Sequence, residues 1–152
     1  MNFCEKPIAV MSWSSGKDSA FALHRIRQGN DISVIGLLTT MNMENDRVSV
    51  HGVRKELLDK QMEVLGLPVD MVMLPMPCDN EVYQQKMSAM IKTFHERGVQ
   101  CVIFGDLFLE DIRQYRVDQM QGTGIKPIFP LWKEDTRLLS RQMVDEGLEA
   151  IV

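Results

Sequence analysis

The sequence predicts an α/β fold in which helices cover both faces of a parallel sheet. Five short apolar runs with strand character alternate along the chain with five segments of helical period. Four of the helical segments run into a glycine, at Gly29, Gly66, Gly98 and Gly147, where a left-handed residue is wanted before the next strand. Repeated strand–helix–strand units make right-handed crossovers between parallel strands, which buries the sheet on both faces.

Each predicted element rests on a local pattern. The strand-like runs are IAVM, VIGLLT, MVML, VQCVIF and PIFPL, at residues 8–11, 34–39, 71–74, 99–104 and 127–131. The predicted helices are residues 18–28, 53–65, 80–97, 110–120 and 136–146. The third of these helices has the clearest period, because one of its faces collects Tyr83, Met87, Met90, Ile91 and Phe94.

Composition excludes several classes of protein. A net charge of −4 and a pI near 5.4 argue against bulk binding to nucleic acid, though not against an RNA or protein substrate held at a local patch. The N-terminus lacks the pattern of a signal peptide, and no apolar stretch approaches the roughly 18 residues that a membrane helix needs. The cysteines at positions 4, 78 and 101 are odd in number and include no CxxC pair. Together these features predict a cytoplasmic protein without a zinc site.

The length predicts a single domain, residues 1–152. The last residues, 149–152, have the character of the start of a sixth strand. We therefore expect a domain that is truncated at its C-terminal end.

A cluster of small polar residues, Ser14 to Ser19 (SSGKDS), follows the first predicted strand and opens the first helix. The first backbone N–H groups of a helix have no internal partners, so this position favours an anion. The pattern matches the pyrophosphatase loop S-G-G-x-D-S except that Ser15 replaces the first glycine. In such a loop the amides, including that of Gly16, and the serine hydroxyls hold the β and γ phosphates of ATP as one leaving group. Lys17 adds a positive charge, and Asp18 is expected to cap the helix.

Two other phosphate loops do not fit. The P-loop G-x-x-x-x-G-K-[ST] fails at its first position, Met11, and at its last, Asp18. The dinucleotide pattern G-x-G-x-x-G is absent from this turn. A serine-rich helix cap beside a solvent-exposed lysine is the plain structural alternative.

Four further stretches resemble the diphthine–ammonia ligase family of the N-type ATP pyrophosphatases. They are HGVR at 51–54, QMEVLGLP at 61–68, FGDLFLEDIRQY at 104–115 and FPLWKEDT at 129–136. The resemblance implies a Rossmann-like sheet in the order 3-2-1-4-5, of the adenine nucleotide alpha hydrolase type. It also implies that ATP and Mg²⁺ are used to adenylate a carboxylate, which ammonia then converts to an amide with release of AMP and pyrophosphate.

The same resemblance bears on partners and on completeness. The acceptor carboxylate is expected either on a protein, as the diphthine of an elongation factor, or on a small molecule. No membrane partner is expected, and a homodimer is left open. Family members commonly carry a further acidic, histidine-bearing motif near their C-terminal end, and this chain ends before such a stretch.

In a 3-2-1-4-5 sheet the loops after the first and fourth strands face each other across the ligand crevice. The second of these loops contains Gly105 and Asp106. Gly105 has no side chain to obstruct the α-phosphate, and Asp106 is suited to bind magnesium. A helix-capping role for Asp106 is the alternative.

The remaining candidates flank these loops. Glu110 and Arg113 can share a helix face, whereas Asp111 and Arg113 cannot. Either the first two form a surface ion pair, or Arg113 is catalytic and steadies the charge of the acyl-phosphate. Glu110 and Asp111 are also candidates for acceptor binding, as are His51 and Arg54 at the start of the second helix, where capping is equally open.

Two alternatives to the amide-forming ligase remain. One is an ATP-binding regulatory module without turnover. The other is a tRNA-modifying enzyme of the same superfamily, for which Cys78 in a loop is the available thiol.

Overall fold

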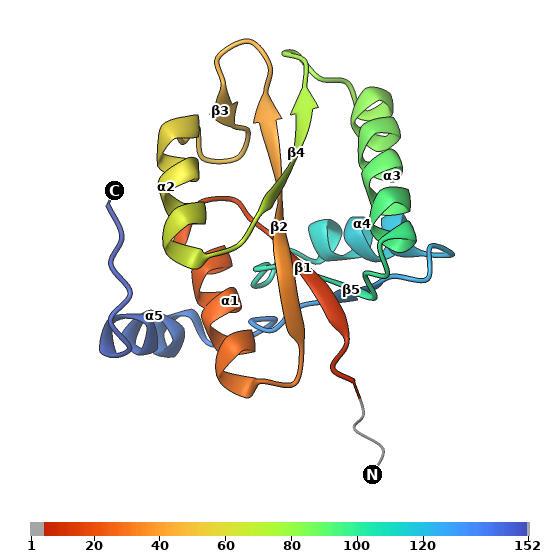
Figure 1. Ribbon diagram of the computed structural model, residues 1–152. Coiled ribbons are helices and arrows are strands. Elements are labelled where there is room, and N and C mark those ends of the chain that lie inside the picture. Colours follow the sequence, from red (N-terminus) through yellow and green to blue (C-terminus); the bar gives the residue numbers. More distant parts are fainter. Residues whose placement is uncertain (1–4, 152) are drawn as a thin grey trace.

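A computed structural model describes residues 5–151 of the chain, and Figure 1 shows its path. The strands are β1 (Ile8–Ser12), β2 (Ser33–Asn42), β3 (Arg47–Val48), β4 (Val69–Leu74), β5 (Cys101–Ile103) and β6 (Lys126–Ile128). The helices are α1 (Lys17–Gly29), α2 (Lys55–Leu65), α3 (Asn80–Glu96), α4 (Glu110–Met120) and α5 (Thr136–Asp145). All ten predicted elements are therefore present, with ends that differ by a few residues.

The sheet confirms the predicted order. β4, β2, β1, β5 and β6 lie side by side in that sequence, and all of these neighbours are parallel. Ala9 in the central strand pairs with Val34 on one side and with Cys101 on the other. The carboxyl ends of β1 and β5 consequently meet at the point where the direction of winding reverses.

The two-residue strand β3 was not predicted. It pairs antiparallel with the end of β2, along the stretch of that strand that lies beyond β1, with Val48 opposite Met41. Val48 is buried, and the Ser49 amide donates a hydrogen bond to the Thr40 carbonyl (2.8 Å). This hairpin directs the following residues, including His51, back toward the carboxyl end of the sheet.

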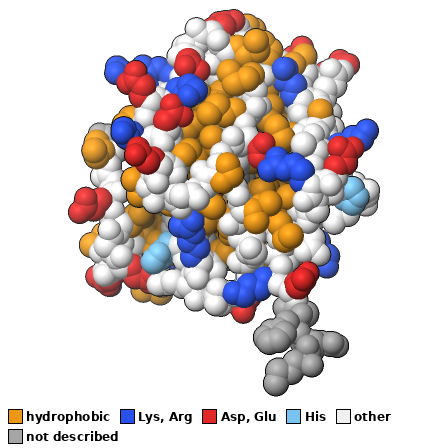
Figure 2. Space-filling view, viewed as in Figure 1, with side chains coloured by type: hydrophobic (Ala, Val, Ile, Leu, Met, Phe, Trp, Pro, Cys, Tyr) orange, Lys and Arg blue, Asp and Glu red, His pale blue; other side chains and the backbone are white. Residues whose placement is uncertain are grey.

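Helices cover both faces of the sheet (Figure 1). One apolar cluster packs α1, α2 and α5 against the sheet, and its buried members include Phe21, Leu58 and Leu139. A second cluster lies on the opposite face under α3 and α4, with Ile91 and Phe94 at its centre. Figure 2 shows hydrophobic side chains gathered between α2 and α3, where β4 forms the edge of the sheet.

The helix ends confirm most of the glycine pattern. Gly66, Gly98 and Gly147 all have left-handed backbones just past a helix. At α1 the prediction is wrong by one residue, because Gly29 is still helical and Asn30 takes the left-handed position with φ of 57°. Asparagine tolerates that conformation better than most residues.

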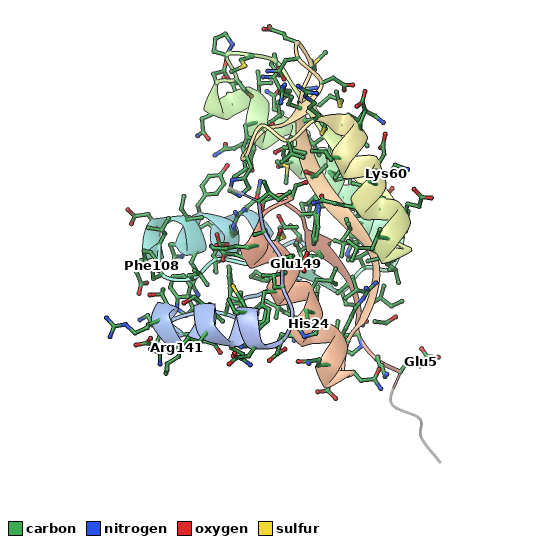
Figure 3. All side chains as sticks on the ribbon, turned by 90° about the vertical axis from the view of Figure 1, so that its left-hand side faces the viewer. Glu5, His24, Lys60, Phe108, Arg141 and Glu149 are labelled. Carbon is green, nitrogen blue, oxygen red and sulfur yellow. The ribbon has the colours of Figure 1, made fainter. Side chains whose placement is uncertain are left out.

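The C-terminal segment differs from the prediction. Residues 149–151 form no strand, and Val152 lies outside the described residues. The helix before this segment, α5, is held to α1 by polar contacts. Among them are His24 Nε2 with Glu146 (2.7 Å) and Arg25 with Gln142 (2.8 Å). Figure 3 shows His24 where α1 passes α5, so this histidine has a partner that the sequence did not indicate. Within residues 5–151, no helix combines the length and apolar character needed to cross a membrane.

Candidate active site

A cavity opens at the carboxyl ends of β1, β2 and β5, and its volume is about 230 Å³. Ten of its sixteen lining residues have polar side chains. These residues come from β1, the start of α1 and the loop between them, from β2, from the β3–α2 turn, from α3, from the loop after β5 and from α4. These polar residues are Ser12, Ser14, Asp18, Ser19, Thr39, Thr40, His51, Tyr83, Asp106 and Arg116. The predicted crevice between the first and fourth predicted strands is therefore present.

The loop between β1 and α1 is held by its own serines. The Ser14 and Ser19 hydroxyls lie 3.1 Å apart, and the Ser19 hydroxyl donates to the Gly16 carbonyl (3.0 Å). The amides of Gly16 and Ser14 point at the Ser14 and Ser19 hydroxyls at 3.3 and 3.4 Å. Ser19 is only 2% exposed. The loop is consequently shaped before any ligand arrives.

Ser15 occupies the position where the loop pattern has glycine, and its backbone is left-handed, with φ of 63°. Its hydroxyl is buried and has no hydrogen-bond partner among the described residues. A non-glycine residue in this conformation is uncommon and strained. Ser15 thus adopts a left-handed backbone conformation that is typical of glycine, although it is not a glycine.

Lys17 and Asp18 are the first two residues of α1 and pair with each other, Nζ to Oδ1, at 2.8 Å. The prediction that Asp18 caps the helix is wrong. Gly16 is the N-cap and no side chain caps this end, because Asp18 already lies inside the first turn. Asp18 lines the cavity, whereas the Lys17 side chain is 55% exposed and does not.

His51 and Arg54 are separated by the fold. A Cβ added to Gly16 would lie 2.6 Å from His51 Nε2, so the imidazole packs directly onto the loop between β1 and α1 and lines the cavity. His51 lies in the turn before α2 and not in the helix. Arg54 is the N-cap of α2, is exposed, and contributes no capping side chain.

Gly105 packs against the start of α1. A Cβ at this position would lie 3.0 Å from the Asp18 carbonyl carbon and from the Ser19 nitrogen. Since backbone atoms cannot rotate away, only glycine fits without moving the helix. Gly105 therefore fixes the spacing between the two loops that face each other across the cavity.

Asp106 accepts a hydrogen bond from Arg116 Nε at 2.6 Å, with only 18% and 24% of the two side chains exposed. The Arg116 guanidinium also lies over the Phe104 ring, at 4.4 Å from its centroid. Asp106 does not cap α4, whose N-cap is Leu109, so that alternative is excluded. The carboxylate is held at the cavity wall, and its other oxygen has no hydrogen-bond partner among residues 5–151.

The other α4 candidates are not brought into the cavity. Glu110 pairs with Lys133 (3.0 Å) on the surface, so the surface ion pair with Arg113, one of the two alternatives, is not formed. Asp111 is exposed. Arg113 packs against the rings of Phe129 and Trp132 instead, with its Cζ 5.0 and 5.3 Å from their centroids.

Several side chains of the lining were not predicted individually, among them Arg116, Tyr83 and Thr39. Arg116 is one turn after Arg113, and this i, i+3 spacing was the only signal for it. Tyr83 belongs to the apolar face of α3 by its period, yet its ring reaches the cavity, where burial raises the pKa of its phenol. Thr39 is 2% exposed and its hydroxyl has no partner in the described structure, which marks a polar contact that a ligand would satisfy.

The order of the sheet and the strand-to-helix loop define this chain as an α/β protein of the PP-loop class. A family model described as the diphthamide synthase N-terminal domain matches residues 6–127. The chain therefore belongs to that family, and the family places it among ATP-utilising PP-loop proteins.

Solved structures agree on the fold. A predicted subunit of a tRNA methyltransferase from Methanocaldococcus jannaschii is 13% identical with a TM-score of 0.54, and the match covers 91% of this chain and 74% of that one. The U34-tRNA thiolase NcsA from Methanococcus maripaludis, solved with its [4Fe-4S] cluster, is 17% identical with a TM-score of 0.51. That match covers 95% of this chain and 59% of the thiolase. No curated protein sequence matches.

Proposed function

We propose that the protein binds ATP in this cavity and cleaves it between the α and β phosphates. The observation that carries the proposal is the preformed loop from Ser14 to Ser19, here called the serine loop. It faces the Asp106–Arg116 pair across the cavity. Backbone amides at a helix start favour phosphate groups. The serine loop would hold the β and γ phosphates, while the opposite wall would face the α phosphate.

The remaining lining residues suit the rest of the nucleotide. The β2 residues Leu38, Thr39 and Thr40 line the cavity beyond the loop, where the adenosine would lie. The unpartnered Thr39 hydroxyl would gain an acceptor or donor there. A tyrosine phenol is neutral at physiological pH, and burial raises the pKa of Tyr83 further, so its phenol can donate a hydrogen bond.

Mg²⁺ fits the same wall. Carboxylates and phosphate oxygens are its usual ligands, and the cavity offers Asp106 and Asp18, each with one carboxylate oxygen outside its ion pair. When bound with ATP, the ion would neutralise phosphate charge. Arg116 would keep the Asp106 carboxylate oriented toward the cavity.

In the proposed reaction a carboxylate oxygen of the acceptor attacks the α-phosphorus, and the bond to the bridging oxygen of the β phosphate breaks. Pyrophosphate leaves and an acyl-adenylate remains. Ammonia then attacks the acyl carbon, the bond to the AMP oxygen breaks, and the nitrogen loses its proton to give the amide. The family to which the chain belongs supports a diphthine-like acceptor for this reaction.

A product assay tests this function. Phosphorus NMR of ATP, Mg²⁺, ammonium and a carboxylate acceptor with the protein should show AMP and pyrophosphate, together with an amide by mass spectrometry. Steady formation of ADP and phosphate by pure protein would contradict the proposal. Binding of ATP without either product would favour the regulatory module.

Activation of a tRNA base by the same adenylation is a second candidate, because both structural neighbours are named for tRNA modification. A thiolating enzyme needs an accessible cysteine, and the described cysteines do not favour this version of the candidate. Cys101 is buried in β5 and Cys78 is half-buried before α3, while Cys4 lies outside the described residues. Adding tRNA in place of the carboxylate separates the two candidates. Pyrophosphate release that depends on tRNA would favour this one.

Asp106→Asn should weaken Mg²⁺-dependent ATP binding with little loss of fold. The amide keeps the size of the side chain and an acceptor for Arg116 but removes the charge that an ion needs. Calorimetry with and without Mg²⁺ measures the effect. The matched control is Asp118→Asn on α4, an exposed carboxylate that accepts a hydrogen bond from Gln114 (2.7 Å). Equal Mg²⁺-dependent affinity in wild type and Asp106→Asn would reject the metal assignment.

A further inference from the structure

Two arginines of α4 lie over a row of aromatic rings beside the cavity. Arg116 lies over Phe104, and Arg113, one turn earlier, lies between Phe129 and Trp132. The rings are themselves in contact, with centroids 5.5 Å apart for Phe104 and Phe129 and 6.2 Å apart for Phe129 and Trp132. The row therefore leads from the wall of the cavity to the ring of Trp132.

The two arginines differ in how their charge is balanced. Arg116 is paired with Asp106 at 2.6 Å. The Arg113 side chain has no hydrogen bond or ion pair with any residue of the described chain, and its Nε is buried. Its two terminal nitrogens also lack acceptors, but they are not among the buried unpartnered atoms and so reach solvent. A half-buried guanidinium without any acceptor is unusual, because unmet buried donors are costly.

The neighbours of Arg113 explain why its guanidinium has no acceptor. Ring faces attract a guanidinium and fix its plane, but they offer no oxygen to its N–H groups. The nearest acidic residue of the same helix face, Glu110, is bound to Lys133 instead. Arg113 is thus held with its terminal N–H groups available, in the fork geometry that suits a carboxylate.

The geometry points to Arg113, backed by Phe129 and Trp132, as a binding site for the carboxylate of the acyl acceptor. This inference rests on the proposed function, which requires an anionic second substrate next to ATP. The phosphates have their own site on the serine loop, and Arg113 does not line the nucleotide cavity. It lies three residues, about 4.5 Å along the helix axis, before Arg116, which does line the cavity. A carboxylate bound there would lie next to the cavity wall proposed to face the α phosphate, on an arginine that has no ion-pair partner among the described residues.

The two indole N–H groups of the chain, on Trp13 and Trp132, provide the test. Trp13 is buried and donates to Gln61 at 3.0 Å, which makes it an internal reference. In nitrogen–proton NMR spectra of the 17.4 kDa protein, hexanoate should shift the Trp132 indole signal saturably. The uncharged hexanamide should not shift it, and the Trp13 signal should stay in place. The signals are assigned with Trp132→Phe.

Variants make the test specific. Arg113→Gln should weaken hexanoate binding by about tenfold or more, since the charged hydrogen bonds are lost. The affinity of Arg113→Lys for hexanoate should lie between those of wild type and Arg113→Gln, because lysine keeps the charge but not the forked arrangement of N–H donors. The control is Arg141→Gln on α5, whose side chain points into solvent (Figure 3) and which should bind like wild type.

Three results would overturn the inference: no saturable shift, an equal shift with hexanamide, or an undiminished shift in Arg113→Gln. A response to inorganic phosphate but not to hexanoate would assign the residue to phosphate and overturn it as well. The ATP-induced rise in melting temperature, measured on the same samples, keeps the two proposals apart. If ATP stabilises wild type and Arg113→Gln alike while hexanoate has no effect, only the carboxylate site fails. If hexanoate binds and ATP does not, only the nucleotide proposal fails.

Discussion

Replacing Gly105 by alanine is expected to lower the free energy of unfolding by about 1–3 kcal/mol, the usual range for an extra methyl group in a closely packed site. The new Cβ would lie 3.0 Å from backbone atoms of Asp18 and Ser19, which cannot rotate away. The first turn of α1 must shift, and the serine loop shifts with it. ATP should therefore raise the melting temperature less in the variant than in wild type. Urea denaturation and a thermal shift assay with ATP measure the two effects.

The matched control is Gly29→Ala at the end of the same helix. Its Cβ would make an ordinary contact, 3.7 Å from Asp31 Oδ2, and Gly29 does not have a positive φ. Alanine favours a helix over glycine by about 0.5–1 kcal/mol, so this variant should be as stable as wild type or slightly more so. If Gly105 served only to leave room for the α phosphate, its variant would bind ATP poorly but unfold like wild type. That outcome would contradict the packing role.

The fold was predictable because its signals are local. Apolar runs and a 3.6-residue period mark each strand and helix, and α4 begins and ends at the predicted residues. β3 escaped notice because two residues carry no period, and its pairing with β2 depends on contacts that form only in the folded sheet. At the end of α1 the left-handed position is taken by Asn30 and not by Gly29. The sequence does not decide between them, because either residue tolerates a left-handed backbone.

The candidate site was predictable from the sequence only where its residues belong to one contiguous segment. The loop from Ser14 to Ser19 is contiguous, so its pattern is visible in the sequence. The opposite wall combines Tyr83 from α3, Asp106 from a loop and Arg116 from α4. Periodicity assigns Tyr83 to a buried face but does not tell core from cavity wall. It likewise places Arg113 and Arg116 on one face of α4 without showing that Asp106 pairs with the second.

Lys17→Ala is expected to lower the rate of ATP cleavage by about 10²–10³-fold, the usual effect of removing one preorganised electrostatic contact. Lys17 is the first residue of α1, where a positive side chain opposes the helix dipole. Its only partner among the described residues is Asp18, in an ion pair whose lysine is 55% exposed. Exposed pairs contribute little, so the ammonium can move to the phosphates at low cost. Pyrophosphate release under saturating ATP measures the rate.

Stability should respond differently from rate. Losing an exposed lysine usually changes the free energy of unfolding by less than about 0.5 kcal/mol, so Lys17→Ala without nucleotide should melt close to wild type. The stabilisation that ATP adds should shrink, because it depends on the affinity of the folded state. Lys55→Ala is the control, since Lys55 is also the first residue of a helix and also pairs with an aspartate, Asp59, at 2.8 Å. It starts α2 and is not part of the loop from Ser14 to Ser19, so its variant should cleave ATP at the wild-type rate. If Lys17→Ala and Lys55→Ala behave alike, Lys17 is an ordinary helix-end lysine, and the charge that the β and γ phosphates require must come from Arg116 or from the metal ion.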